Sequence, residues 1–334
     1  MNVIIPKAIS KILIQFCIST KEATKIKIKN VIDEYDKTRP YIPSSPYIDE
    51  TAIKYFGKIH TAEDHIWGPR DYFRSDYYRN ANCYFASEIG YHGCSSPKAL
   101  DKFLKTSYPI FKADGTPTSE YLAHASSIVN NMSSQYAYRI RLMSDQVETL
   151  FNKNFDNIVD FSKASQISQA EAMKYFIENF RIDRNRNGGI IWWNIMDGWP
   201  QISDSVIDYS FIKKLAYYYI KRSQNKTLLA FKEDNHDLKL YFINDLNSKI
   251  SINFEVIDAI NDEIVLKGTA SCENYSSKEI FSFKNYLTQK YYILKWHFDG
   301  NTFINHYVSN IKPISLELYS NTLEKYELLN FEGF

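Results

Sequence analysis

The sequence is poor in cysteine, and this shortage limits both its redox chemistry and its location. Only four cysteines occur among 334 residues, at Cys17, Cys83, Cys94 and Cys272, with neither a metal-ligand spacing nor a dense disulfide framework. We therefore expect free thiols in a reducing compartment and a cytoplasmic protein. A disulfide between Cys83 and Cys94 is the less favoured alternative.

Excess charge and long apolar runs are also lacking. The 40 basic and 39 acidic side chains give a formal net charge of +1, which is not the electrostatic footprint of a nucleic-acid-binding or anionic-membrane-binding protein. No run is apolar for the roughly 18 residues of a membrane span. The short apolar run 12–18 lacks a clean cleavage site, so we expect no signal peptide. Neither nucleic acid nor membrane is a predicted partner.

The apolar pattern divides the chain into an α/β part and an all-β part. In residues 23–222, apolar runs alternate with helical patterns, as is typical of parallel βα units. We count four such units, with strands near residues 39–42, 58–68, 83–89 and 188–194. Residues 223–334 contain period-2 segments separated by turn clusters, which predicts an immunoglobulin-like β-sandwich. Residues 1–22 fit neither part and stay unassigned.

Helical spacing of apolar residues, together with capping signals, predicts the helices of the α/β part. The predicted segments are residues 23–35, a short helix within 71–82, 96–105, a helix starting at Thr118–Glu120, 136–151, 167–180 and an exit helix around 217–222.

Residues 83–97, CYFASEIGYHGCSSP, place a carboxylate at the end of a short apolar strand. Glu88 closes the apolar run, and Gly90 and Gly93 follow it. Barrel enzymes keep their catalytic groups at this end of a strand. A plain core strand with a capping acid is the alternative interpretation.

Residues 188–200, GGIIWWNIMDGWP, combine a buried strand with paired aromatic residues and an acid. Trp192 and Trp193 precede Asn194 and Asp197. Ring faces can stack on sugar rings while polar groups hold hydroxyls. Because side chains alternate along a strand, we expect only one of the two tryptophans to contact a substrate.

Four segments of the chain form an ordered set. They are YDKTRPYIPSSP (35–46), EDHIWGPRDYF (63–73), FASEIGYHG (85–93) and IIWWNIMDGWPQISDSVIDY (190–209). With the Tyr-Tyr…Lys-Arg pattern of 217–222, this set resembles the β-mannosidase-like branch of glycoside hydrolase family 2. Lys37 and Ile89 depart from the family pattern, which has a proline and an aromatic residue there.

The resemblance implies a fold and an activity. The fold would be the C-terminal half of a (β/α)8 TIM barrel over residues 23–222, followed by the sandwich over 223–334. The activity would be that of a retaining exo-β-glycosidase, first of all a β-mannosidase, acting on a β-linked oligosaccharide or glycoside. β-Glucosides, β-galactosides and β-glucuronides are the alternative substrates. We expect no metal and no cofactor.

The resemblance also assigns roles to residues. Glu88 would be the nucleophile that forms the glycosyl-enzyme intermediate. The candidate substrate-binding residues are His65, Trp67, Trp192, Trp193, Asn194, Asp197 and Trp199. Arg70, Tyr91 and His92 are near Glu88 in sequence or motif, and the sequence leaves open which of them approaches it.

The second carboxylate of a retaining glycosidase is missing from this pattern. Family members carry it in an Asn-Glu pair upstream of the 35–46 segment, and no Asn-Glu dipeptide occurs in this chain. Glu63 and Asp64 are expected to be solvated loop acids, and Glu178 an exposed ion pair with Arg181. The acid/base is therefore predicted to be absent from this chain.

This absence keeps a second hypothesis open. The chain could be a truncated, catalytically inactive fragment that acts at most as a sugar-binding or assembly module. A half barrel leaves strand edges unpaired, which favours self-association or pairing with a separate N-terminal half.

Overall fold

The fold is known from a computed structural model. It describes residues 25–39, 41–47, 54, 61–68, 70, 72–81, 83–105, 110–112, 116–125, 141–284 and 288–334. The unassigned segment 1–22 and part of the predicted helix 136–151 lie outside the described residues.

A small parallel sheet lies at the centre of the α/β part. It contains β1 (Thr61–His65), β2 (Cys83–Gly90) and β3 (Gly189–Trp193), in the spatial order β1-β2-β3. All three were predicted. The fourth predicted strand, at 39–42, is wrong, because the described residues there have no strand. Prolines at 40 and 43 remove backbone donors that a strand would need.

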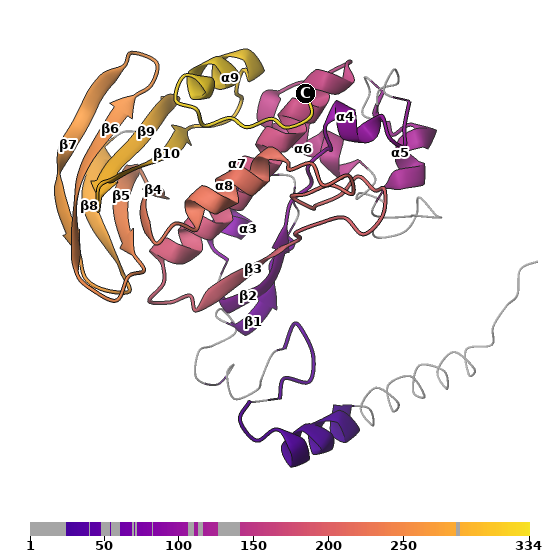
Figure 1. Cartoon of the computed structure of the whole chain (residues 1–334), viewed down its shortest axis with the longest axis horizontal. Coiled ribbons are helices and arrows are strands. Elements are labelled where there is room, and N and C mark those ends of the chain that lie inside the picture. The colour runs from indigo at the N-terminus through magenta and orange to yellow at the C-terminus, as the bar shows by residue number, and fades with distance from the viewer. Residues whose placement is uncertain are drawn as a thin grey trace, which may run out of the picture.

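Helices pack around this sheet and on the sandwich (Figure 1). Besides a helix over residues 25–35, they are α3 (Asp76–Arg79), α4 (Pro97–Leu100), α5 (Ser119–His124), α6 (Leu142–Phe151), α7 (Ile158–Ile182), α8 (Leu215–Ser223) and α9 (Leu316–Glu324). The predicted starts of α4 and α5 are confirmed. Ser96 and Thr118 each accept a hydrogen bond from a first-turn N–H, which is how an N-cap residue stabilises a helix.

The all-β part consists of two antiparallel sheets. The strands are β4 (Thr227–Asp234), β5 (Asp237–Asn244), β6 (Ile250–Asp258), β7 (Glu263–Cys272), β8 (Ser276–Lys284), β9 (Lys290–Phe298) and β10 (Asn301–Ser309). One sheet has the order β10-β9-β6-β7 and the other β4-β5-β8. Apolar side chains from both sheets, including Leu240, Phe242 and Trp296, share one core. The predicted antiparallel β part is therefore confirmed as far as Ser309, whereas α9 is a helix within the range 223–334 that was predicted to be a sandwich.

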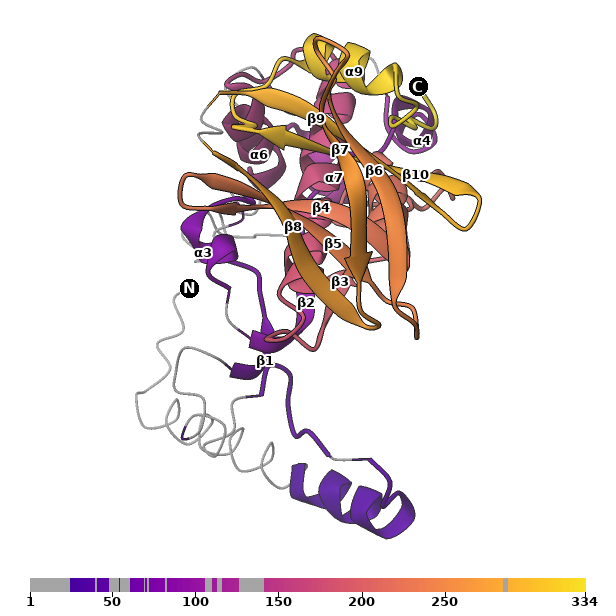
Figure 2. The ribbon, with the colours of Figure 1, turned by 90° about the vertical axis from the view of Figure 1, so that its left-hand side faces the viewer.

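A second core joins the sheets of the two parts. Ile89 of the parallel sheet, Ile167 of α7 and Val308 of β10 belong to one buried cluster. The larger antiparallel sheet thus packs on β4-β5-β8 with one face and contributes to the helical core with the other. Figure 1 shows α7 and α8 between the parallel sheet and the sandwich, and Figure 2 shows α7 behind the strands of the sandwich.

Buried polar contacts reinforce this junction, and one of them corrects a prediction. Glu178 is not in an exposed pair with Arg181, since it is only 3% exposed. Its carboxylate accepts hydrogen bonds from Lys174 at 2.8 Å and from Asn305 of β10 at 2.9 Å. Arg181 instead pairs with Asp245 at 2.8 Å. The Glu178 carboxylate, which the sequence predicted to face solvent, is therefore bound by the preceding turn of its own helix and by a strand of the sandwich.

The C-terminal segment leaves the sandwich and returns to the α/β part. The Lys98 backbone N–H donates to the Gly333 carbonyl at 3.2 Å, and the Tyr218 hydroxyl donates to Glu332. The C-terminus accordingly lies beside α4 (Figure 1). These contacts hold the last residues against α4 and α8.

Two expectations about thiols and membranes can be compared with the structure. Cys83, Cys94 and Cys272 are free and buried, so the alternative of a Cys83–Cys94 disulfide is wrong. Among the described residues, none of the helices combines the length and apolar character needed to cross a membrane.

Candidate active site

Three of the predicted site residues meet where β1 and β2 end. The two strands run parallel, and His65 is the register partner of Glu88. The Trp67 indole Nε1–H donates to Glu88 Oε1 at 2.8 Å. His65 Nδ1 lies 3.4 Å from Glu88 Oε2. Each carboxylate oxygen thus faces a nitrogen from the neighbouring strand end.

A glycine lets the Trp67 ring lie against the sheet. A Cβ atom on Gly90 would lie 2.6 Å from Trp67 Cη2 and 2.8 Å from the Trp193 carbonyl oxygen. The Arg70 guanidinium also lies 4.6 Å from the centre of the Trp67 ring, where a cation is attracted to the π-system. The indole is therefore fixed in the orientation that directs its N–H to Glu88.

The other two residues named near Glu88 lie elsewhere. Tyr91 is buried in the core, with its ring packed edge-on against Phe73 and Phe176. His92 Nε2 lies 3.4 Å from Asp204. Of the three candidates left open by the sequence, Arg70 is the one that reaches the site, through Trp67.

The two tryptophans of β3 face opposite sides of the sheet. Ile89 pairs in register with Trp192, and Gly90 with Trp193. Trp192 packs against the same core as Ile89, whereas Trp193 is 49% exposed. Because side chains alternate along a strand, Trp193 shares the open face with Glu88. Contact of either ring with a sugar stays a prediction.

A second carboxylate lies beside this cluster, and its surroundings correct another prediction. Glu63 is not a solvated loop acid, because it lies on β1 with its carboxylate occupied by three donors. Ser45 Oγ donates to Oε1 at 2.5 Å, Ser87 Oγ donates to the same oxygen, and the Tyr47 N–H donates to Oε2 at 2.6 Å. Asp64, its neighbour, accepts from the His65 backbone N–H at 2.8 Å.

These contacts set the charge of Glu63. Burial alone would raise its pKa, but the hydrogen bonds from Ser45, Ser87 and Tyr47, helped by His65, outweigh burial and lower the pKa below its usual range. A general acid must hold a proton that it can donate near the working pH. Glu63 is therefore poorly suited to replace the missing acid/base.

Sequence reasoning missed Glu63, Ser45 and Ser87 as members of this cluster. The one available signal was the period-2 spacing of Glu63 and His65, which places both on one face of a strand. The role of Ser45 depends on where residues 41–47 pass the sheet, and no local pattern shows that.

The remaining predicted residues lie in the loop after β3. Asp197 is buried, and its carboxylate accepts from the hydroxyls of Ser203 at 2.5 Å and Ser205 at 2.6 Å. Trp199 stacks beside His124, with ring centres 6.3 Å apart. Asn194 directly follows β3. The structure thus assigns Asp197 to holding its own loop, and a contact with substrate stays a prediction for all three.

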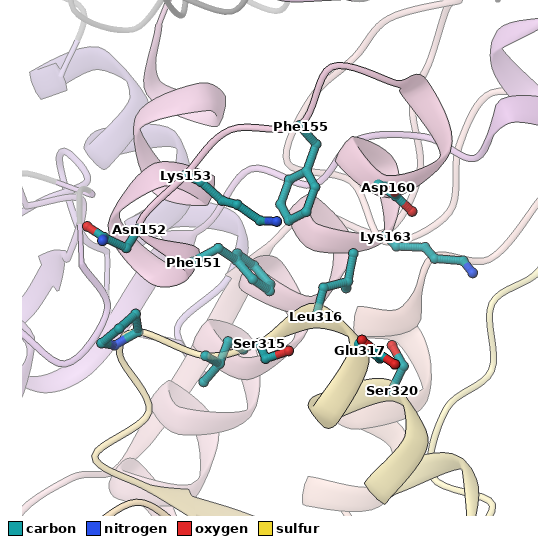
Figure 3. A pocket seen from close by; sticks show the side chains of 12 residues that line it. Phe151, Asn152, Lys153, Phe155, Asp160, Lys163, Ser315, Leu316, Glu317 and Ser320 are labelled. Atoms are coloured by element: carbon teal, nitrogen blue, oxygen red, sulfur yellow. The ribbon is translucent and has the colours of Figure 1, made fainter.

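The structure also contains a pocket that shares no lining residue with this cluster. It has a volume of about 650 Å³ and lies between the α6–α7 connection and the start of α9 (Figure 3). Phe151, Phe155 and Leu316 provide apolar walls, while Lys153 and Glu317 supply opposite charges. Its lining carries no counterpart of the Glu88 arrangement.

The arrangement around Glu88 defines a class of site. A carboxylate at the end of a parallel strand, with the Trp67 N–H and the His65 ring directed at it and a second indole ring on the same open face, fits the site that the resemblance to glycoside hydrolases implies. No family model matches the chain, but similar curated proteins and solved structures do exist.

The curated relatives are β-mannosidases. The chain is 25% identical over 219 residues to β-mannosidase B of Aspergillus clavatus, which covers 63% of this chain and 23% of that protein. It is 26% identical over 246 residues to the β-mannosidase of Capra hircus, covering 66% and 26% of the two chains. The chain thus spans about a quarter of the length of these relatives.

Solved structures share the fold. The β-D-mannosidase of Dictyoglomus thermophilum matches with a TM-score of 0.66 and 21% identity, over 84% of this chain and 34% of that one. The exo-chitosanase of Amycolatopsis orientalis matches with a TM-score of 0.54 and 14% identity, over 75% and 30%. The predicted resemblance to β-mannosidase-like proteins of glycoside hydrolase family 2 is confirmed.

Proposed function

We propose that this chain carries the nucleophile half of a retaining exo-β-glycosidase of the β-mannosidase type. The observation that carries the proposal is the geometry of Glu88, which accepts from the Trp67 indole at 2.8 Å and faces His65 Nδ1 at 3.4 Å. A nucleophile must be held where it can reach the anomeric carbon, and the Trp67 hydrogen bond fixes the orientation of the Glu88 carboxylate.

In the proposed reaction, a Glu88 oxygen attacks the anomeric carbon of a terminal β-linked sugar. A bond between that oxygen and the carbon forms as the glycosidic carbon–oxygen bond breaks, and the leaving oxygen takes a proton from a general acid. Water then hydrolyses the glycosyl ester, which releases the sugar and restores the Glu88 carboxylate. Trp193, on the open face, is the candidate stacking surface for the sugar.

The proposal also covers the fold around the site and the source of the general acid. We infer that β1, β2 and β3 are part of a (β/α)8 barrel, and that the seven-stranded β part is an immunoglobulin-like sandwich. The general acid would come from outside residues 1–334, because no Asn-Glu pair occurs in them and Glu63 is held ionised. Loss of general acid catalysis alone costs roughly 10²–10⁴-fold in rate.

A substrate with a good leaving group tests the nucleophile without the acid. We expect the purified chain to release dinitrophenolate from a dinitrophenyl β-mannoside, because this group departs with little protonation. The Glu88→Gln variant should lose the release, and intact-protein mass spectrometry should find a glycosyl adduct on the wild type but not on this variant. Glu324→Gln, on the exposed surface of α9, is the matched control and should react like the wild type.

Either result decides the proposal. Release that depends on Glu88 supports a poised nucleophile, and the matching β-glucoside, β-galactoside and β-glucuronide then rank the sugars. No release from a folded wild type would contradict the enzymatic proposal for this chain.

The alternative is a sugar-binding or assembly module without activity. The missing Asn-Glu pair favours it, as does the apolar surface on and after β3, where Ile191, Trp193 and Ile195 are exposed. Titration of the inactive Glu88→Gln variant with a mannoside separates the two outcomes of a negative activity assay. Saturable binding would support a sugar-binding module, and no binding would leave assembly with another chain.

A further inference from the structure

One hydroxyl group connects Glu63 to His65. Ser45 Oγ lies 2.5 Å from Glu63 Oε1, 2.8 Å from His65 Nε2 and 3.4 Å from Ser87 Oγ. A serine hydroxyl has one proton to donate and can also accept. The direction of these bonds therefore fixes where the proton of the imidazole ring lies.

The direction follows from the charge of Glu63. An ionised carboxylate only accepts hydrogen bonds, so the 2.5 Å contact requires the Ser45 proton to point at Glu63. With its single proton used, Ser45 Oγ can only accept from His65. Nε2 of His65 must then carry a proton and donate it to Ser45.

We propose that Glu63 is a positioning residue which, through Ser45, keeps Nε2 of His65 protonated and directs Nδ1 at Glu88. The inference rests on the proposed function only in treating Glu88 as the nucleophile. The neutral ring can then not adopt the tautomer with a proton on Nδ1. His65 donates to Glu88 only when it gains a second proton, and otherwise presents a lone pair.

The distance on the Glu88 side agrees with this assignment. Nδ1 and Glu88 Oε2 are 3.4 Å apart, which is longer than the usual N–H···O bond of about 2.7–3.2 Å. A permanent Nδ1–H donor would be expected to close to that range. Glu88 instead takes its close hydrogen bond from Trp67 at 2.8 Å.

An isosteric variant should reverse the proton direction. In Glu63→Gln, the position of Oε2 still faces the Tyr47 backbone N–H. That N–H can only donate, so the amide oxygen must occupy this position. The amide NH₂ then faces Ser45 and donates to it. The Ser45 proton turns to His65, Nε2 becomes the acceptor, and the ring proton moves to Nδ1.

The tautomer can be read directly from ring nitrogen shifts. We would record long-range ¹H–¹⁵N spectra of histidine-labelled full-length chain at alkaline pH, and assign His65 by its loss in His65→Gln. A protonated ring nitrogen resonates far upfield of one with a lone pair. We expect the protonated shift at Nε2 in the wild type and at Nδ1 in Glu63→Gln.

Matched variants distinguish the Glu63–Ser45–His65 hydrogen-bond relay from a general loss of structure at the site. Ser87→Ala removes another hydrogen bond to Glu63 but leaves Ser45 in place, so Nε2 should stay protonated. Ser45→Ala should abolish the fixed preference. A wild-type Nε2 without a proton, or a Glu63→Gln spectrum identical to the wild type, would overturn the inference.

The readout needs no substrate, so it is independent of turnover. The expected tautomers in a chain without dinitrophenolate release would uphold the relay and reject the enzymatic proposal. Dinitrophenolate release from a chain with the opposite His65 tautomer would uphold the enzymatic proposal and reject the relay.

Discussion

At the scale of single residues, the site depends on how closely Trp67 approaches the backbone of β2. Gly90 leaves room for the indole, since a Cβ there would lie 2.6 Å from Cη2 of Trp67. The same Cβ would lie 2.8 Å from the Trp193 carbonyl oxygen, which belongs to the backbone and cannot move aside easily. The hydrogen bond from Trp67 to Glu88 therefore depends on the absence of one methyl group.

Gly90→Ala should displace Trp67 and destabilise the fold. Overpacking of this kind costs about 1–3 kcal/mol in the free energy of unfolding, which urea denaturation followed by tryptophan fluorescence measures. Gly268→Ala on β7 is the matched control, because its Cβ would meet Phe254 at an ordinary 3.5 Å. Equal stability losses in the two variants would contradict the steric account.

The sequence predicted part of this site and missed the rest for a physical reason. Glu88 closes an apolar run, so its place at a strand end could be predicted from local pattern, whereas His65 and Trp67 were predicted from the family resemblance of residues 63–73. Glu63 was predicted to be a solvated acid, because its donors come from Ser45 and Ser87, which are distant in sequence. Such contacts depend on the fold and leave no periodic signal.

At the scale of elements, α7 is the helix that packs against both the α/β part and the sandwich. Apolar spacing predicted only residues 167–180, whereas the helix spans Ile158–Ile182. Its first turns bury polar side chains instead: Ser165 accepts from the Cys94 N–H, and Gln166 donates to the Cys94 carbonyl. A buried face made of serine and glutamine does not produce an apolar period, so the start of the helix was predicted too late.

Glu171, on the same helix, joins α7 to β10 and α9. Its carboxylate lies 2.7 Å from His306 Nε2 and accepts from the Tyr319 hydroxyl at 2.6 Å. Burial alone would raise its pKa, but His306, Lys174 and Tyr319 outweigh burial and lower the pKa to about 2. Because the folded pKa is below the unfolded value, this carboxylate stabilises the fold above about pH 4.5, and the contribution is lost as the pH falls toward 2.

Glu171→Gln should therefore lower the free energy of unfolding at neutral pH and reduce its dependence on pH in acid. The amide keeps the size of the carboxylate but not its charge, and hydrogen bonds to charged groups contribute about 1.5–3 kcal/mol, so we expect a loss of this order in urea unfolding at pH 7. Between about pH 5 and pH 3, the stability of the variant should fall less steeply than that of the wild type. The exposed Glu324→Gln variant should retain the wild-type slope, and an unchanged slope in Glu171→Gln would contradict the assignment.

At the scale of the whole molecule, the parallel sheet is less enclosed than the sandwich. In the described part of the chain, β1 and β3 each pair with β2 alone. Ile191 of β3 is 56% exposed, and Ile195 and Phe211 are also exposed nearby in sequence. Unpaired parallel edges with apolar side chains are a surface on which chains associate. We propose that a second copy of the chain covers this surface when no other partner is present.

Sedimentation velocity should then show association that grows with protein concentration, and Ile191→Lys should suppress it. Charge on β3 would be buried at the interface, where an unpaired ion is costly. Ile264→Lys is the matched control, since Ile264 lies on β7, an edge strand of the sandwich, and is 51% exposed. If Ile264→Lys suppressed association instead, the sandwich edge would be the interface. A wild type that stays monomeric at every concentration would contradict this proposal. The exposed edge of the parallel sheet would then be stable in contact with solvent.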